Sequence, residues 1–375
     1  MRRFLHCGYV RKTFQYRLYP TKKQHALLNA QLAEACRLYN AAVQERRDAW
    51  KMRKTSLTYY QQANQLRHIR AAGDLTLANY TSCQDVLRRV DNAYHAFFRR
   101  VKAGQKPGYP RFKSVTRFHS YTFPKYGNGC KLKPEDKQLY IQGVGELKVK
   151  LHREVVGRIK TVTLKKSCGK WDVCFSIIVP DPSPLPATGN ATGIDVGLTS
   201  FAVLSDGTTI KNPRCYQSAH AKLRRVQRKV ARRQKTSNRR RKAVRELKLV
   251  HHHIRNQRRD FHHQVSRILI NQYDLIACEK LNIKGLTRGM LAKSICDVGW
   301  GSFLAILSDK AAEAGREAVK VNPKGTSQRC ICGAAVPKTL QDRWHHCPTC
   351  QLSVPRDHAS ALEILRLGLS RRETT

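Results

Sequence analysis

Acidic residues are scarce in this sequence of 375 residues. It contains 26 Asp and Glu against 71 Lys and Arg, which gives a formal net charge of +45. A folded chain tolerates so much charge of one sign when a polyanion neutralises it, so we expect a nucleic acid partner and binding that weakens steeply as salt rises. An anionic membrane surface is the weaker alternative, because no long basic amphipathic helix with a Trp- and Phe-rich face stands out.

Long apolar runs are also missing. No stretch approaches the ~18 apolar residues of a membrane span, and the opening MRRFLHCGYV lacks the apolar region of a signal peptide. We therefore expect a cytoplasmic, nucleoid-associated bacterial protein without membrane contact, whose 13 cysteines are reduced thiols. Hydrophobic residues still make up 41% of the chain, enough for the cores of two or three domains.

The first half of the sequence changes from one strand to helices and then to several strands. Residues 13–19 alternate apolar and polar side chains, which is typical of a half-buried strand. Thr21 and Gln24 then form a capping box for a helix that runs to about Trp50, and a helical pattern continues over about 59–101. Short alternating strands follow the Pro- and Gly-rich segment 106–112 and predict a small barrel interrupted by the helical block.

The second half follows a Pro-rich linker that begins at Asp181. Residues 193–197 and 200–205 are expected strands, with a hairpin turn at Asp206-Gly207 after the second one. Residues 273–279 are an expected buried strand, and 299–315 an amphipathic helix. A last helix starts near His358. Between 222 and 259, seventeen Lys and Arg accompany one Glu, and an apolar residue recurs every seven positions at Leu247, Ile254, Phe261 and Ile268. This spacing predicts a helix, and phosphate contact explains its charge better than a solvated helical face does.

Three acids stand at positions where a carboxylate needs a partner. Asp195 interrupts an apolar strand, Glu279 ends another one, and Asp357 begins the last helix. Buried carboxylates are costly unless paired, and such a set can hold two divalent cations, Mg²⁺ or Mn²⁺, for phosphodiester hydrolysis. Singly, Asp357 could be a helix cap and Glu279 an ion-pair partner of Lys280; the ordered set on a basic chain favours a metal site.

Two cysteine pairs resemble the ligands of a structural zinc ribbon. Cys347 and Cys350 have the usual spacing, whereas Cys330 and Cys332 are one residue closer than usual. His345 or His346 could therefore replace one thiolate. Four buried free cysteines are the alternative to a Zn²⁺ site, but four of them within 21 residues favour the metal.

Aromatic residues are interleaved with basic ones between residues 59 and 98. Exposed tyrosines there can stack on bases or read them. A helix-bundle core is the better interpretation for most members of the set, and Phe97 and Phe98 are expected to be core. The residues are Tyr59, Tyr60, Tyr80, Tyr94, Phe97 and Phe98.

A set of short motifs occurs along the chain in a fixed order. In sequence order the motifs are Arg17-Leu-Tyr-Pro20, Gly108-Tyr-Pro-Arg-Phe112, Gly193-Ile-Asp-Val-Gly197, Cys278-Glu-Lys-Leu281, Leu291-Ala-Lys-Ser with Trp300-Gly, Thr326-Ser-Gln, the cysteine pairs and Arg356-Asp357. This ordered set closely resembles the TnpB family of transposon-encoded RNA-guided DNA nucleases, which are related to the type V CRISPR effectors. The resemblance covers nearly the whole chain. The chain departs from the family where His-Ala-Ser-Ala follows Asp357, since Asn-Ala-Ala is more usual.

The resemblance implies a multidomain α+β protein. A wedge β-barrel would comprise residues 1–20 and 105–180, with a helical recognition domain inserted at 21–104 and a linker at 181–192. An RNase H-like RuvC α/β domain would comprise 193–325 and 352–375, with a basic helical insertion at 212–268 and a zinc-ribbon insertion at 326–351.

The resemblance also implies the partners and the roles of individual residues. A noncoding guide RNA would direct the protein to double-stranded DNA beside a short adjacent motif, and a single RuvC site formed by Asp195, Glu279 and Asp357 would cut both strands. Tyr59 and Gln84 lie where the family reads the adjacent motif. Arginines of the basic block would bind the nucleic acid backbone: Arg224, Arg225, Arg228, Arg232, Arg239, Arg240 and Arg241.

Two other hypotheses remain beside an active nuclease. A nuclease-inactive RNA-guided DNA-binding protein that represses or assists transposition would be expected to have lost an acid. An RNA-binding structural protein would explain the charge but not Asp195 and Glu279. The sequence leaves the oligomeric state open.

Overall fold

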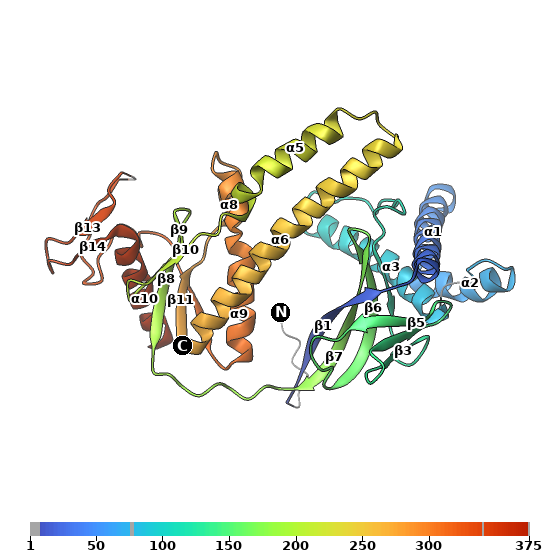
Figure 1. Cartoon of the computed structure of the whole chain (residues 1–375), viewed down its shortest axis with the longest axis horizontal. Helices are drawn as coiled ribbons and strands as arrows, with labels where there is room; N and C mark the ends of the chain where they lie inside the picture. The colour runs from blue at the N-terminus through green and yellow to red at the C-terminus, as the bar shows by residue number, and fades with distance from the viewer. Residues whose placement is uncertain (1–7, 76–78, 340, 374–375) are drawn as a thin grey trace. The chain divides into compact units, whose positions relative to one another are not determined.

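The structure of this chain is a computed structural model that describes residues 8–75, 79–339 and 341–373 (Figure 1). The chain divides into two compact units, Met1–Asp181 and Pro182–Thr375. Among the described residues, no helix is long and apolar enough to cross a membrane.

A seven-stranded antiparallel sheet curls into a nearly closed barrel in the first unit. β1 lies near its middle, because it pairs with β7 along most of its length and with β5 at its end. The predicted alternation of β1 is confirmed, with Tyr16 and Leu18 buried. The order is β2-β6-β7-β1-β5-β4-β3, with β1 (Tyr9–Tyr19), β2 (Ser120–Phe123), β3 (Cys130–Lys133), β4 (Gln138–Ile141), β5 (Gly145–Lys150), β6 (Arg158–Ser167) and β7 (Lys170–Pro180).

Three helices follow β1 and share one apolar core with the sheet: α1 (Lys22–Arg53), α2 (Tyr59–Ala71) and α3 (Tyr80–Lys102). The predicted capping box is confirmed, since Thr21 accepts from the Gln24 N–H and Gln24 accepts in return from the Thr21 N–H. The helical pattern expected over 59–101 is divided between α2 and α3. α2 ends beside Gly73, whose φ of +87° is incompatible with a continuing helix.

The prediction that Phe98 is core is wrong, because half of its surface is exposed, whereas Phe97 is partly buried. The buried residues of α3 end at Tyr94, so the last two turns of the helix extend past the core. Val101 in the same turns is also half exposed.

The second unit contains a five-stranded sheet of order β10-β9-β8-β11-β12. β8 and β12 run parallel to β11, while β9 and β10 form an antiparallel meander with β8. The predicted Asp206-Gly207 turn joins β9 and β10. The strands are β8 (Ala191–Val196), β9 (Ser200–Leu204), β10 (Thr209–Lys211), β11 (Leu275–Glu279) and β12 (Glu317–Val321).

Helices cover both faces of this sheet. On one face, α6 (Asn238–Gln272) and α9 (Trp300–Glu313) pack on Ile194 and Ile276. On the other face, α10 (Arg356–Glu373) packs on Leu275 and Ala277 through Ile364. The predicted helices at 299–315 and near 358 correspond to α9 and α10.

The basic block forms two helices, α5 (His220–Ala231) and α6, which pack on each other through Leu223, Val226 and Val250. The predicted apolar stripe holds at Ile254, which is buried, but Ile268 is 54% exposed. A straight α-helix drifts by ~20° per seven residues, so three such steps carry a seven-residue repeat off the buried face. Three short helices, α4 (Cys215–Ser218), α7 (Ile283–Leu286) and α8 (Ala292–Val298), and a two-stranded sheet of β13 (Trp344–His346) and β14 (Ser353–Pro355) complete the unit.

Candidate active site and metal centre

Two of the predicted acids lie on neighbouring parallel strands. β8 and β11 are in register from Ala191 opposite Leu275 to Ile194 opposite Cys278, so Asp195 and Glu279 occupy the next position on each strand. Side chains alternate along a strand. Because Ile194 and Cys278 face the core beneath α6 and α9, both carboxylates point to the opposite face, which α10 covers.

Small residues allow α10 to lie directly on this face. A Cβ on Gly193 would lie 2.1 Å from the Ala361 carbonyl oxygen of α10, and one on Gly368 of α10 would lie 2.5 Å from the Ala277 Cβ. Gly193 and Ala277 each precede one of the two acids by two residues and therefore share its face. This close approach brings the first turn of α10, with Asp357, to the ends of β8 and β11.

The pKa of Asp195 indicates that the three acids lie near one another. Burial, followed by the negative charges of Glu279 and Asp357, raises the pKa of Asp195 to about 8. Arg356 opposes this shift without cancelling it. A buried carboxylate near two others is stabilised in its charged form by a cation, so this donor set fits hard divalent metal ions.

Glu279 is held by Thr326, a residue without a predicted role. The Thr326 hydroxyl donates a hydrogen bond of 2.5 Å to Glu279 Oε1, and Thr326 is 4% exposed. Burial raises the pKa of Glu279, and this hydrogen bond counteracts the rise. The Thr326-Ser-Gln motif was recognisable in the sequence, but its contact with Glu279 was not.

The start of α10 is held by the segment that precedes it. The Arg356 guanidinium donates to the carbonyl oxygens of Thr339, at 3.0 Å, and Asp342, at 3.4 Å. His358, which replaces the more usual Asn, donates from Nε2 to the Ser205 carbonyl at 3.1 Å. These contacts fix the helix end that carries Asp357.

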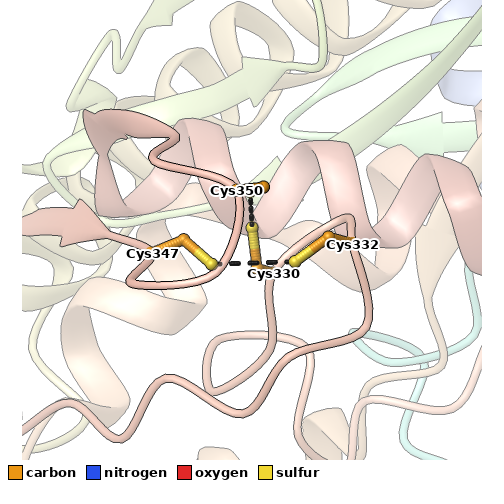
Figure 2. Close-up of side chains that lie close together, drawn as sticks. All are labelled: Cys330, Cys332, Cys347 and Cys350. Atoms are coloured by element: carbon orange, nitrogen blue, oxygen red, sulfur yellow. Dashed lines mark hydrogen bonds between the residues drawn. The ribbon is translucent and has the colours of Figure 1, made fainter.

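The four predicted zinc ligands come together in a cluster of sulfur atoms (Figure 2). The Sγ atoms of Cys330 and Cys350 are 3.5 Å apart, those of Cys332 and Cys347 are 3.6 Å apart, and all four lie within 4.8 Å of one another. Zn–S bonds of about 2.3 Å in tetrahedral geometry place sulfurs about 3.8 Å apart, so the cluster fits one zinc ion. Backbone N–H groups of Cys350 and Thr349 lower the pKa of Cys347 to about 6, which favours its thiolate, whereas burial raises the pKa of the neighbouring Cys330.

Histidine is not needed to complete this set. His345 is fully buried, but its Nδ1 is hydrogen-bonded to Lys338 Nζ, and it lies outside the converging group. Gly333 follows the short Cys330-Ile-Cys332 pair with a φ of +90°, and the chain turns there. Among the described residues, these four cysteines are the group whose ligand atoms all lie close enough together to bind one metal ion. The carboxylate oxygens of Asp195, Glu279 and Asp357 are further apart, although Glu279 and Asp357 still influence Asp195 electrostatically.

The arginines predicted to bind nucleic acid lie in or next to α5 and α6. Arg224, Arg225, Arg228 and Arg232 are exposed and, with Lys229 and Arg233, line one side of α5. Arg239 and Arg241 are exposed in the first turn of α6, and Arg240 is partly buried there. The structure therefore leaves most of this charge accessible to a ligand.

Tyr59 and Gln84 lie on the adjacent helices α2 and α3. The Arg88 guanidinium is 5.3 Å from the centroid of the Tyr59 ring, and Gln84 lies one helical turn before Arg88. Tyr59 and Gln84 are both partly buried, and Tyr60 beside them is 76% exposed.

Three family models match this chain. "Probable transposase" matches residues 174–290, and "Cas12f1-like, TNB domain" matches 300–364, which includes the cysteine cluster and the start of α10. A third model, "Helix-turn-helix domain", matches 10–55. In this chain those residues form β1 and the single long helix α1 rather than two helices.

Curated relatives match over nearly the full length. "Putative RNA-guided DNA endonuclease" of Streptomyces pristinaespiralis is 31% identical over 96% of this chain and 90% of its own. "Putative RNA-guided DNA endonuclease InsQ" of Escherichia coli K12 is 27% identical over 95% of this chain and 92% of its own. A solved structure, "mini-RNA-guided endonuclease CRISPR-Cas_phi3", shares the fold with a TM-score of 0.50 at 9% identity, covering 96% of this chain and 93% of that one. With its motifs in order and this similarity over most of its length, the chain belongs to the TnpB family.

Proposed function

We propose that this protein is an RNA-guided DNA endonuclease of a transposable element, which cleaves DNA at one RuvC-type site formed by Asp195, Glu279 and Asp357. The observation that carries the proposal is the gathering of three carboxylates on the α10 face of the sheet, where burial and the charges of Glu279 and Asp357 together raise the pKa of Asp195. Acids brought together from three separate elements at such an electrostatic cost favour a metal site over a structural one.

We propose for this chain the domain bounds that the resemblance implies. Residues 193–325 and 352–375 would form the RNase H-like RuvC domain, which agrees with two acids on adjacent parallel strands and a third on the covering helix. The barrel would be the wedge domain, α1 to α3 the recognition domain, 212–268 the basic helical insertion and 326–351 the zinc ribbon.

The chain's own groups have separable tasks at this site. The carboxylates supply hard oxygen ligands for Mg²⁺ or Mn²⁺. Divalent cations held by these carboxylates would supply activation of water and stabilisation of the leaving oxygen of a phosphodiester. Thr326 holds the Glu279 carboxylate in place, and Arg356 holds the first turn of α10. Zn²⁺ at the four cysteines would be structural, since four thiolates leave no open position.

The nucleic acid partners would be a noncoding guide RNA and a target DNA duplex. The exposed arginines of α5 and α6 would contact the backbone of the RNA–DNA heteroduplex, whose sequence is read by base pairing. Replacing Arg224, Arg225, Arg228 and Arg232 by Glu should reduce the slope of log K against log salt by about 0.7–0.9 per lost phosphate contact. An unchanged slope would remove α5 from the interface. Tyr59 and Gln84 would read the motif beside the target.

The experiment that tests this function begins with the RNA that copurifies with the protein. That RNA is sequenced, the guide segment is changed to match a chosen duplex, and the duplex is offered with a randomised flank and Mg²⁺. Cleavage that follows the guide and selects one flanking motif is the expected result. Absence of cleavage at all flanks, with binding intact, would support the nuclease-inactive alternative, which the three retained acids do not favour.

A further inference from the structure

A pocket of about 460 Å³ opens in the first unit, between the last turns of α1 and α3. Five of its nine lining side chains are aromatic: Trp50, Tyr94, Phe97, Phe98 and Tyr109. Trp50 is 55% exposed, Phe98 50% and Tyr109 39%. A contiguous aromatic surface left in contact with water marks a binding site more often than a fold requirement. Nothing in the function proposed above uses this pocket.

The aromatic side chains that line the pocket pack against one another. The Phe97 ring centroid lies 5.2 Å from those of Phe98 and Tyr109, at interplanar angles of 68° and 74°. The hydroxyls of Tyr94 and Tyr109 are 3.3 Å apart. Edge-to-face contacts of this kind are favourable, so the aromatic surface is formed before a ligand arrives.

The surroundings of the pocket are cationic. The Arg46 guanidinium lies 5.2 Å from the Tyr94 ring centroid and is held by Gln62 and Asp91. The Arg47 guanidinium lies 5.1 Å from the centroid of Tyr109 and 4.6 Å from that of Phe112. Exposed cations also end both helices: Lys51, Arg53 and Lys54 at the end of α1, and Arg99 and Lys102 at the end of α3.

Aromatic walls within a cationic rim complement a ligand that is flat and apolar in one part and anionic in another. Single-stranded nucleic acid has this chemistry, because bases stack on aromatic rings while phosphates meet the surrounding Lys and Arg. Thr55 and Ser56 add hydroxyl groups to the lining. Hydroxyls beside a stacked base can bond the ribose 2′-OH, which distinguishes RNA from DNA.

We propose that this pocket binds an unpaired base of single-stranded RNA, stacked on Trp50 and Phe98. The site is separate from the base contacts assigned above to Tyr59 and Gln84. The choice of RNA rests on the proposed function, in which RNA is the resident partner, whereas the stacking site rests on the pocket alone.

Tryptophan fluorescence tests the site in the whole protein after bound RNA has been removed. Trp171 and Trp300 are buried and Trp344 is 58% exposed, so in a Trp344→Phe background Trp50 is the exposed fluorophore. A ten-nucleotide oligouridylate should quench it saturably. Phe98→Ala should weaken the affinity for this RNA by roughly tenfold, as should Trp50→Ala when binding is followed by anisotropy of a labelled oligonucleotide.

The controls separate stacking from general effects. Tyr140→Ala removes a ring that is 41% exposed on β4 of the same unit and should leave affinity unchanged. Thermal melting of Phe98→Ala checks that the fold is intact, which its exposure predicts. Equal quenching by the deoxy oligonucleotide would overturn the choice of RNA, and no quenching by either would overturn the site.

If the Trp50 fluorescence is quenched by raising the protein concentration without any RNA, a second copy of the chain occupies the pocket. This result would also overturn the proposal. The assay needs no Mg²⁺ and no target DNA. A failure of guided cleavage would therefore leave its result intact, and a failure of quenching would leave the proposed nuclease intact.

Discussion

The cysteine cluster and the carboxylate set differ in how far their members lie apart in the chain. The four cysteines come from residues 330–350, and two turns of the chain bring their sulfur atoms together. The acids at 195, 279 and 357 need the pairing of β8 with β11 and the packing of α10 on both strands. The first cluster can therefore form locally, whereas the second exists only when the domain has folded.

The two clusters are also connected. Thr326 precedes the cysteines and binds Glu279, and Arg356 follows them and fixes the turn that carries Asp357. The segment organised by the cysteines thus begins and ends at the carboxylate site. A locally formed cluster can in this way position groups of a site that is assembled from distant parts of the chain.

The largest expected effect is the loss of DNA cleavage, without loss of DNA binding, when one of the three acids is replaced. Asp195→Asn keeps the size of the side chain but removes a charged ligand, so guided cleavage should fall by ~1,000-fold or more, equivalent to about 4 kcal/mol. Cleavage is measured on a matched duplex in Mg²⁺, and target binding by filter retention should persist. Asp260→Asn is the control, because Asp260 is an exposed acid of α6 bonded to Gln264. Cleavage at the normal rate in Asp195→Asn would exclude the site.

The second prediction asks whether the cysteine cluster is local. Cys350→Ser should weaken zinc affinity by ~100-fold or more, since one of four thiolates is lost. Metal content and hydrogen exchange are measured together. Faster exchange should be confined to residues 326–355, while β8 and β11 stay protected. Cys296→Ser, at an exposed cysteine outside the cluster, should change neither, and loss of protection throughout the sheet would refute the idea of a local cluster.

The third prediction concerns the connection between the clusters. Thr326→Val removes the hydroxyl at nearly constant volume and leaves Glu279 without its donor, so cleavage should fall by about tenfold, or ~1.4 kcal/mol. Thr326→Ser should restore most of the activity. The Mg²⁺ concentration for half-maximal cleavage should rise in the valine variant and recover in the serine variant. Equal losses in both variants would point to packing instead.

The smallest expected effect lies on the opposite face of the same sheet. His262 is buried against Phe201 and Phe303 and donates from Nε2 to the Val298 carbonyl. Burial lowers its pKa below the ordinary 6.5, so the unfolded chain takes up a proton there before the folded one does. The resulting stability is present above pH 6.5 and is lost as pH falls through the folded pKa, by at most about 1.4 kcal/mol per pH unit.

Denaturant titrations at pH 7 and pH 5 measure this contribution of His262. His262→Gln should be less stable than the native protein at pH 7 but should lose less stability on acidification. Parallel losses in the two proteins would show that His262 does not titrate in this range. The carboxylate face is untouched by this variant, so cleavage at pH 7 should persist.

Local patterns were sufficient for several parts of the fold. The capping box at Thr21, the alternation of β1 and the turn at Asp206-Gly207 each depend on residues that are close in sequence, and each is present. Predictions of burial from residue spacing were wrong where the environment of a residue depends on distant elements. Ile268 continues the seven-residue repeat but leaves the buried face of α6, and Phe98 follows the pattern of α3 beyond the end of the core.

The candidate site divides in the same way. The three acids could be predicted as metal ligands from sequence because each one is a carboxylate at a position where its segment alone offers it no partner. The four cysteines could be predicted because of their spacing. The Thr326–Glu279 hydrogen bond and the aromatic pocket could not be found from sequence, since both join residues far apart in the chain. Trp50 of α1, for example, lines the pocket together with Phe97 and Phe98 of α3, which come more than forty positions later in the chain.

The sequence by itself determined the strong positive charge, the types of ligand and the order of motifs that places this chain in the TnpB family. Tertiary structure alone decided that Asp195 and Glu279 share one face of the sheet and that Gly193 lets α10 approach them closely. The reason is physical: charge and donor chemistry belong to individual residues, whereas the distance between two residues depends on everything packed between them.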